Sequence, residues 1–165
     1  MLTKMEEMQK DIKVLKAALL DEDEKITDIM PRPLSSIEAL QQFEEQIDDA
    51  LRKRLLNVLA SLQGGSDAAK ICRKIMRTCM TNGCMSQFSG TGQKGKARFM
   101  DTKLFTIVID AGRKALKKKQ ISVEELKNEV FEVLRSAPNK PGGSNYMKKQ
   151  KEKRRRCLPE IPEDD

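Results

Sequence analysis

The sequence predicts an all-α protein: a compact bundle of about five helices, with a coiled-coil helix before it and a disordered basic tail after it. Three observations favour this fold class. Apolar residues recur at helical spacing in each long segment, capping residues precede these segments, and no stretch alternates like a half-buried strand. The expected organisation is a coiled coil at 1–20, an acidic linker at 21–33, a helical domain at 34–137 and a disordered basic tail at 138–165.

The first segment carries an apolar heptad pattern. Its interface positions are Met5, Met8, Ile12, Leu15 and Leu19, which follow alternating three- and four-residue spacing. In this register Asp11 and Lys16 form an attractive pair across a parallel dimer. We therefore expect a homodimer through residues 1–20. The alternative is a helix that packs on its own domain, since so short a coiled coil is marginally stable alone.

Residues 35–65 predict two helices, or one bent helix, with a break near Asp48–Asp49. Ser35 and Glu38 have the spacing of a capping box at the start of this segment. Two apolar stripes follow, and Gly64-Gly65 ends the segment.

The next helix starts at Ser66 or Asp67 and is expected to stop at Asn82-Gly83. One face of this helix is apolar, and the members of that face are Ile71, Cys72, Ile75, Met76 and Cys79. The opposite face carries four cations without interleaved acids, namely Lys70, Arg73, Lys74 and Arg77. The alternative for these four is an ordinary solvated face.

The last two helices of the domain are capped by Asp101 or Thr102 and by Ser122. The former ends in the cations Lys117, Lys118 and Lys119, which also complement a helix dipole. The latter has an apolar stripe and stops at Pro138. The members of that stripe are Val123, Leu126, Val130, Val133 and Leu134.

Composition restricts the chemistry of the chain. Histidine is absent from the 165 residues, which excludes every histidine-based catalytic or metal-binding mechanism within this chain. The four cysteines, Cys72, Cys79, Cys84 and Cys157, form no CxxC pair. No apolar run is long enough to span a membrane, and no signal-peptide pattern is present. We expect a soluble, intracellular protein that is not an enzyme and takes no metal or cofactor.

Positive charge is concentrated in one part of the chain. Residues 70–119 carry 13 Lys/Arg and 2 Asp/Glu, so their net charge of +11 exceeds the +7 of the whole protein. Such a block is typical of a surface that binds nucleic-acid phosphates. The candidate nucleic-acid-binding residues are Lys70, Arg73, Lys74, Arg77, Lys94, Lys96, Arg98, Lys117, Lys118 and Lys119.

Residues 90–97, GTGQKGKA, match the phosphate-loop pattern GxxxxGK but have Ala97 where that loop needs Ser or Thr for Mg²⁺. No strand pattern precedes them, so we expect no ATP or GTP binding. The glycines permit tight turns beside Lys94, Lys96 and Arg98, an arrangement suited to a polynucleotide phosphate. The alternative is a tight connector between two helices.

The tail contains a cationic cluster, "KKQKEKRRR". Its basic residues are Lys148, Lys149, Lys151, Lys153, Arg154, Arg155 and Arg156. This cluster predicts a nuclear-import signal or a nucleic-acid arm, and hence a nuclear protein. The alternative is a disordered solubilising tail.

The run from Ala68 to Lys114, with its glycine-lysine loop between an R-x-x-[LIM] helix and a V-I helix, resembles an uncharacterised animal domain family of unknown function. That resemblance spans about 34–137. More distantly, the loop and Met100-Asp101 resemble BEN domains, which are all-helical and bind DNA or act as adaptors in chromatin and transcription complexes. This resemblance implies a DNA-binding or chromatin-associated module. The alternative function is a protein–protein adaptor that dimerises through the N-terminal helix and holds an acidic partner.

Overall fold

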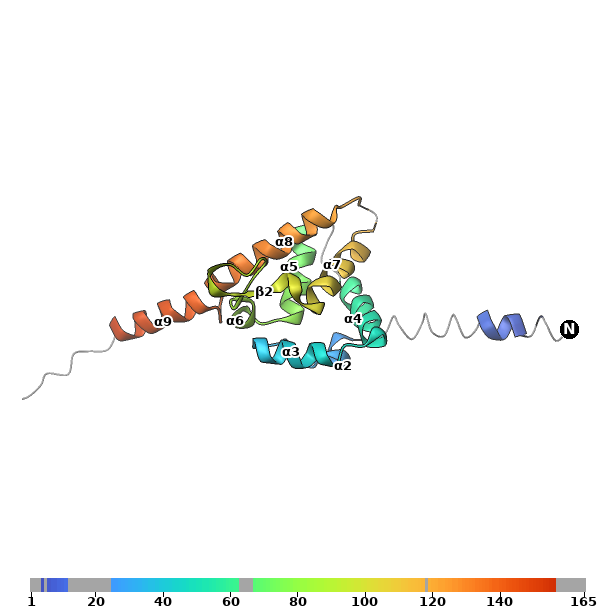
Figure 1. The fold of residues 1–165 in the computed structure, drawn as a ribbon, viewed down its shortest axis with the longest axis horizontal. Coiled ribbons are helices and arrows are strands. Elements are labelled where there is room, and N and C mark those ends of the chain that lie inside the picture. Colours follow the sequence, from blue (N-terminus) through green and yellow to red (C-terminus); the bar gives the residue numbers. More distant parts are fainter. Residues whose placement is uncertain (1–3, 5, 12–24, 63–66, 118, 157–165) are drawn as a thin grey trace, which may run out of the picture.

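The structure is a computed structural model that describes residues 4, 6–11, 25–62, 67–117 and 119–156. Within these ranges the chain is mostly helical, which confirms the predicted all-α class (Figure 1). Five helices of nine or more residues form the bundle between 37 and 136. The α-helices are α2 (Ile26–Ile29), α3 (Ile37–Glu45), α4 (Asp49–Ser61), α5 (Ala68–Cys79), α6 (Asn82–Met85), α7 (Lys103–Ala115), α8 (Val123–Ser136) and α9 (Ser144–Arg156).

Side-chain caps set the starts of the long helices. The predicted caps Asp67, Thr102 and Ser122 are confirmed, since each accepts a hydrogen bond from a backbone N–H in the first turn of its helix. At α3 the prediction was one residue off, because the Oγ of Ser36 accepts from Ala39 N at 3.1 Å. The predicted break is confirmed by Asp48, whose Oδ1 accepts from Leu51 N at 2.7 Å and starts α4.

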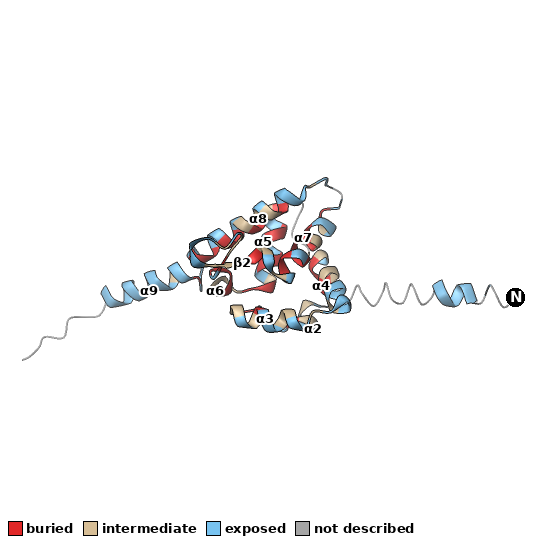
Figure 2. Ribbon diagram, viewed as in Figure 1, coloured by how far each residue is buried: buried red, intermediate tan, exposed pale blue. Residues whose placement is uncertain are grey.

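The core lies where α5 packs against α7 and α8, with α4 on the other side of α7 (Figure 2). The predicted apolar face of α5 is buried throughout. Phe99 is fully buried, and the rings of Phe88 and Phe105 meet it edge-on with centroids 5.6 and 5.8 Å away. Val123 was wrongly placed in the core stripe: it is 38% exposed, because it lies in the first turn of α8, ahead of the packed part.

Two elements between α5 and α7 differ from the prediction. The stop expected at Asn82-Gly83 was wrong, because α5 ends at Cys79 and these two residues begin α6, which Thr81 caps. A small parallel sheet joins β1 (Phe88–Ser89) to β2 (Ala97–Arg98), although no strand was predicted. Strands of two residues are too short to show an alternating pattern.

The predicted disordered tail was wrong for residues 144–156, which form α9. Before it, Ala137–Asn139 form a 3₁₀ turn that buries Pro138 against the domain. Residues 157–165 lie outside the described ranges.

Little of the N-terminal coiled coil is described. Residues 6–11 are helical, and Met8 is 61% exposed. The other four interface positions, Met5, Ile12, Leu15 and Leu19, lie outside the described residues, so the dimer stays a prediction.

Candidate functional site

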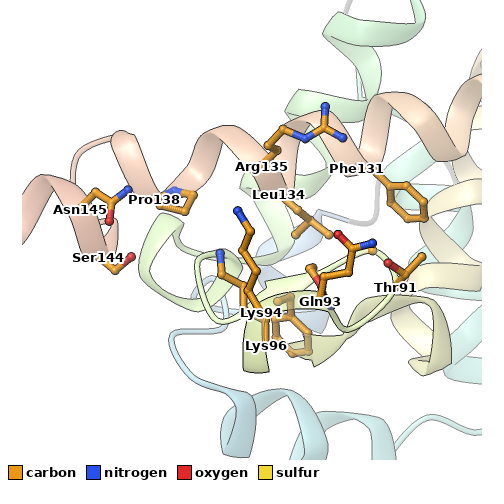
Figure 3. A pocket seen from close by; sticks show the side chains of 13 residues that line it. Thr91, Gln93, Lys94, Lys96, Phe131, Leu134, Arg135, Pro138, Ser144 and Asn145 are labelled. Atoms are coloured by element: carbon orange, nitrogen blue, oxygen red, sulfur yellow. Dashed lines mark hydrogen bonds between the residues drawn. The ribbon is translucent and has the colours of Figure 1, made fainter.

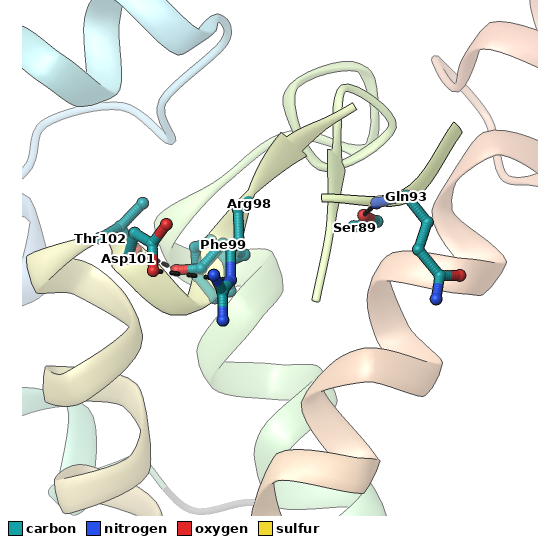
Figure 4. A network of polar contacts seen from close by, with 6 residues as sticks. All are labelled: Ser89, Gln93, Arg98, Phe99, Asp101 and Thr102. Atoms are coloured by element: carbon teal, nitrogen blue, oxygen red, sulfur yellow. Dashed lines mark hydrogen bonds and ion pairs between the residues drawn. The ribbon is translucent and has the colours of Figure 1, made fainter. Parts of the chain in front are cut away.

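The glycine-rich loop is a tight return between two parallel strands. Parallel neighbours ordinarily need a long crossover, but here Gly90–Lys96 bring the chain back in seven residues. Positive φ angles make this possible, at Gly92 (81°), Lys94 (58°) and Gly95 (69°). The loop is also tied internally, because Gln93 N donates to Ser89 Oγ at 2.7 Å (Figure 4). Its shape is therefore set before any ligand arrives.

Lys94 is the only residue other than glycine with positive φ in the described part of the chain. This left-handed conformation is uncommon for a residue with a Cβ atom and costs about 1 kcal/mol. Glycine would serve the turn at lower cost. Strained side chains of this kind concentrate at functional sites, which makes the Lys94 ammonium a candidate for function.

Gly90 allows the loop to lie directly against α8. A Cβ atom at this position would stand 2.5 Å from Cδ1 and Cε1 of Phe131 and 2.7 Å from its Cγ. Real Cβ atoms do not approach other atoms so closely. The glycine is thus needed for packing as well as for turning.

A cavity of about 620 Å³ opens between the loop, the end of α8 and the start of α9 (Figure 3). Lys94 and Lys96 extend from the loop toward α8, which contributes Arg135. Among the described residues, neither lysine pairs with a carboxylate, whereas Arg135 pairs with Glu132. The other lining residues are Phe88, Ser89, Gly90, Thr91, Gln93, Phe131, Leu134, Pro138, Ser144 and Asn145.

The start of α9 is held firmly at the rim of this cavity. Asn82 Nδ2 donates to the carbonyl of Pro141 at 2.9 Å, and Ser144 N donates to Ser86 Oγ at 3.4 Å. A Cβ atom at Gly143 would stand 2.2 Å from the carbonyl oxygen of Ala137. The backbone there passes too close for any side chain, so the direction in which α9 leaves the domain is specified.

From this rim α9 projects away from the helical core (Figure 1). All seven cations predicted as an import signal lie on this helix, and all are exposed. Glu152 is the single acid on α9. Lys94, Lys96 and Arg135 line the cavity, and the seven cations at 148–156 follow along α9, which starts at the rim of that cavity.

The remaining predicted binding residues lie elsewhere. Arg98 pairs with Asp101, with 3.6 Å between Nε and Oδ1, and does not line the cavity (Figure 4). The cations of the basic α5 face, at 70, 73, 74 and 77, are all exposed.

The structure does not bring the 117–119 cluster together with the loop. Lys117 and Lys119 line a separate groove with Arg113, beside the first turn of α8. The loop lies beside Phe131 and Arg135, which are about 12–18 Å along the helix axis from Val123 at the start of α8. Lys118 lies outside the described residues.

Sequence reasoning missed Arg135 and the polar rim residues Gln93 and Asn145. Arg135 stands in the last turn of a helix, where a cation usually has the ordinary role of complementing the dipole. Nothing in its neighbours along the chain indicates that it lines the same cavity as the loop, about 40 residues earlier.

The three cysteines that the structure describes, Cys72, Cys79 and Cys84, are buried and offer no chemistry to the cavity. Burial raises the pKa of Cys72 and of Cys79 to about 12 and that of Cys84 to about 11. Glu129 adds to the shift at Cys72, and Glu38 adds to the shift at Cys84. These thiols are protonated at neutral pH and are poor nucleophiles and poor metal ligands.

The described ranges contain no group of three or more His, Cys, Asp or Glu side chains placed to hold a metal ion. They also contain no helix with the length and apolarity needed to cross a membrane.

A scan of protein-family models, a search of curated proteins and a search of solved structures each find no match to this chain. The resemblances to an uncharacterised animal domain family and to BEN domains stay predictions from the sequence.

Proposed function

We propose that this chain is a nuclear, non-enzymatic module that binds nucleic acid, with double-stranded DNA as its ligand. The observation that carries the proposal is that the start of α9 is held by hydrogen bonds at the rim of the cavity. That helix carries seven exposed cations, and the cavity at its start is lined by Arg135 and by Lys94 and Lys96, which pair with no carboxylate among the described residues. Phosphates attract such a surface over many positions at once, and the release of their counterions drives binding.

The charges within α9 support a polyanionic partner. Lys149 and Lys153, and Lys151 and Arg155, stand four residues apart and repel each other on the helix surface. Glu152 offsets only part of this repulsion. A phosphate backbone beside the helix removes it, so binding also stabilises α9.

The loop works here as a contact for phosphates and is not a nucleotide-hydrolysing site. In a phosphate loop, the backbone runs from a strand into the N-terminus of a helix, whose N–H groups face the anion. After this loop the chain enters β2, which begins with Ala97. The arrangement lacks the metal-binding hydroxyl and the helix dipole behind the loop.

The test is a fluorescence-anisotropy titration of duplex DNA over a salt series. Each phosphate contact contributes about 0.9 to the slope of log affinity against log salt. Replacing Lys151, Arg154 and Arg155 by Gln should flatten the slope by up to about 3, and the double change Lys94→Ala and Lys96→Ala by up to about 2. All duplex sequences should be affected about equally, because phosphate contacts carry no sequence information.

The matched control is the double change Lys53→Gln and Arg113→Gln, which removes two exposed cations that do not line the cavity. This control should keep the wild-type slope. Equal slopes in the α9 variant and the wild type would overturn the proposal.

A second function is favoured by the separation of the basic groups. The groove that Arg113, Lys117 and Lys119 line lies too far from the cavity to share one small ligand with it. In this alternative the chain is an adaptor that dimerises through residues 1–20 and holds an acidic protein partner. Binding of an acidic peptide that depends on Arg113 and Lys117, without DNA binding, is its expected result.

A further inference from the structure

The cavity beside the loop contains more than cations. Phe131, Leu134 and Pro138 give it an apolar wall, while Thr91, Gln93, Ser144 and Asn145 supply hydrogen-bond donors and acceptors. Lys94 and Lys96 extend from the loop toward that wall, and Arg135 lies on α8 beside Leu134. A surface that only contacted duplex phosphates would need these cations and neither the apolar wall nor the hydrogen-bonding side chains.

The size of the cavity also indicates a ligand larger than a single phosphate group. Its volume of about 620 Å³ lies in the range of small-molecule pockets. One phosphate group fills only a small part of such a space. The space, the wall and the polar rim together suit a larger ligand that has an apolar face, polar edges and a negative charge.

We propose that this cavity takes a single unpaired nucleotide of a nucleic-acid strand, at a bulge or an open end. The base lies on the wall of Phe131, Leu134 and Pro138, and the adjoining phosphates lie at Lys94 and Lys96. Gln93 and Asn145 reach the polar edges of the base. This inference rests on the proposed function and adds to it a preference for unpaired sites in duplexes.

The parts of the cavity are organised in advance for such a ligand. The bond from Gln93 N to Ser89 Oγ fixes the loop, and the side-chain amide of Gln93 is engaged by no hydrogen bond among the described residues. Gly90 packs the loop on Phe131, and the hydrogen bond from Ser144 N to Ser86 Oγ fixes the start of α9. A site that needs little ordering on binding loses little affinity to entropy.

The experiment compares two labelled DNA duplexes of one sequence, one fully paired and one with a single unpaired adenosine in the middle. Anisotropy titration of the full chain should give about tenfold tighter binding of the bulged duplex, the gain typical of one base on an apolar protein surface. Phe131→Leu should remove this preference, and the paired duplex should remain bound through the cations of α9 and of the loop. Phe131→Tyr keeps the ring and should keep the preference.

The control is again the pair Lys53→Gln and Arg113→Gln, which should leave the ratio of the two affinities unchanged. Thermal melts identify any variant that is not folded. Equal affinity of the wild type for both duplexes overturns this inference alone, whereas no binding to either duplex overturns the proposed function with it. Competition by millimolar adenosine monophosphate for the bulged site alone would show that the cavity takes free nucleotides, and would overturn the strand-held assignment.

Discussion

Gly90→Ala isolates the contact that holds the glycine-rich loop on the domain. The φ angle of Gly90 is not in the left-handed region, so the backbone itself accepts alanine. The obstacle is the ring of Phe131, because three of its atoms would lie only 2.5–2.7 Å from the added methyl group. Ordinary contacts between carbon atoms are about 3.5–4.0 Å long, so the loop or the ring has to move by about 1 Å.

Overpacking of this kind costs about 1–3 kcal/mol. Alanine in place of glycine also lowers the entropy of the unfolded chain, which raises the free energy of unfolding by about 0.4–1 kcal/mol. The net destabilisation should be about 1–2 kcal/mol, and the melting temperature should fall by about 4–8 °C. Thermal unfolding followed by circular dichroism measures both quantities.

The same change in a Phe131→Ala background reverses the expected sign. With the ring removed, the methyl group meets no obstacle, and Gly90→Ala should be neutral or stabilising by about 0.4–1 kcal/mol. The double-mutant cycle should therefore give a coupling of about 1–3 kcal/mol. If Gly90→Ala costs the same with and without the ring, the loop is not held on Phe131 and the reasoning fails.

Further predictions concern the strained lysine, the buried thiols, the dimer and the import signal. Lys94→Gly should relieve the left-handed strain and raise stability by up to about 1 kcal/mol while weakening DNA binding, and a less stable variant would contradict this. The three buried thiols have raised pKa values, so the stability they contribute is complete below pH 9 and is lost as pH rises toward 11–12; urea titrations should show a fall of up to about 4 kcal/mol per pH unit above 9. Replacing Ile12 and Leu15 by Asp should convert a dimer to a monomer in sedimentation, and a wild-type monomer at high concentration would disprove the dimer. A reporter fused to residues 140–165 should enter nuclei and lose this when 154–156 become alanine, whereas even distribution of the intact fusion would exclude an import signal.

Local signals in the sequence predicted the bundle well. Caps at Asp67, Thr102 and Ser122 and the apolar face of α5 were readable because each depends on residues within one or two turns. The pocket was not readable in this way. Its cations come from positions 94, 96 and 135, and only the packing of α8 on the loop brings them together.

The prediction of a disordered tail was wrong for a different reason. From residue 138 on, the chain has too few apolar residues to form a core, and its charge density is typical of disorder. The start of α9 is instead held by backbone contacts, including hydrogen bonds to Asn82 and Ser86 and the close approach at Gly143. Composition does not reveal contacts of this kind.

The parallel pairing of β1 with β2 holds the two ends of the glycine-rich loop side by side, with Phe88 opposite Ala97. A segment whose ends are clamped can change its length at small cost, since doubling a loop adds only about 0.6 kcal/mol of closure entropy. An exchange confined to residues 91–96 would leave the contact of Gly90 with Phe131 in place. The domain is thus a scaffold on which loops of other lengths and sequences can be grafted, and selection or design could alter what it recognises there without rebuilding the fold.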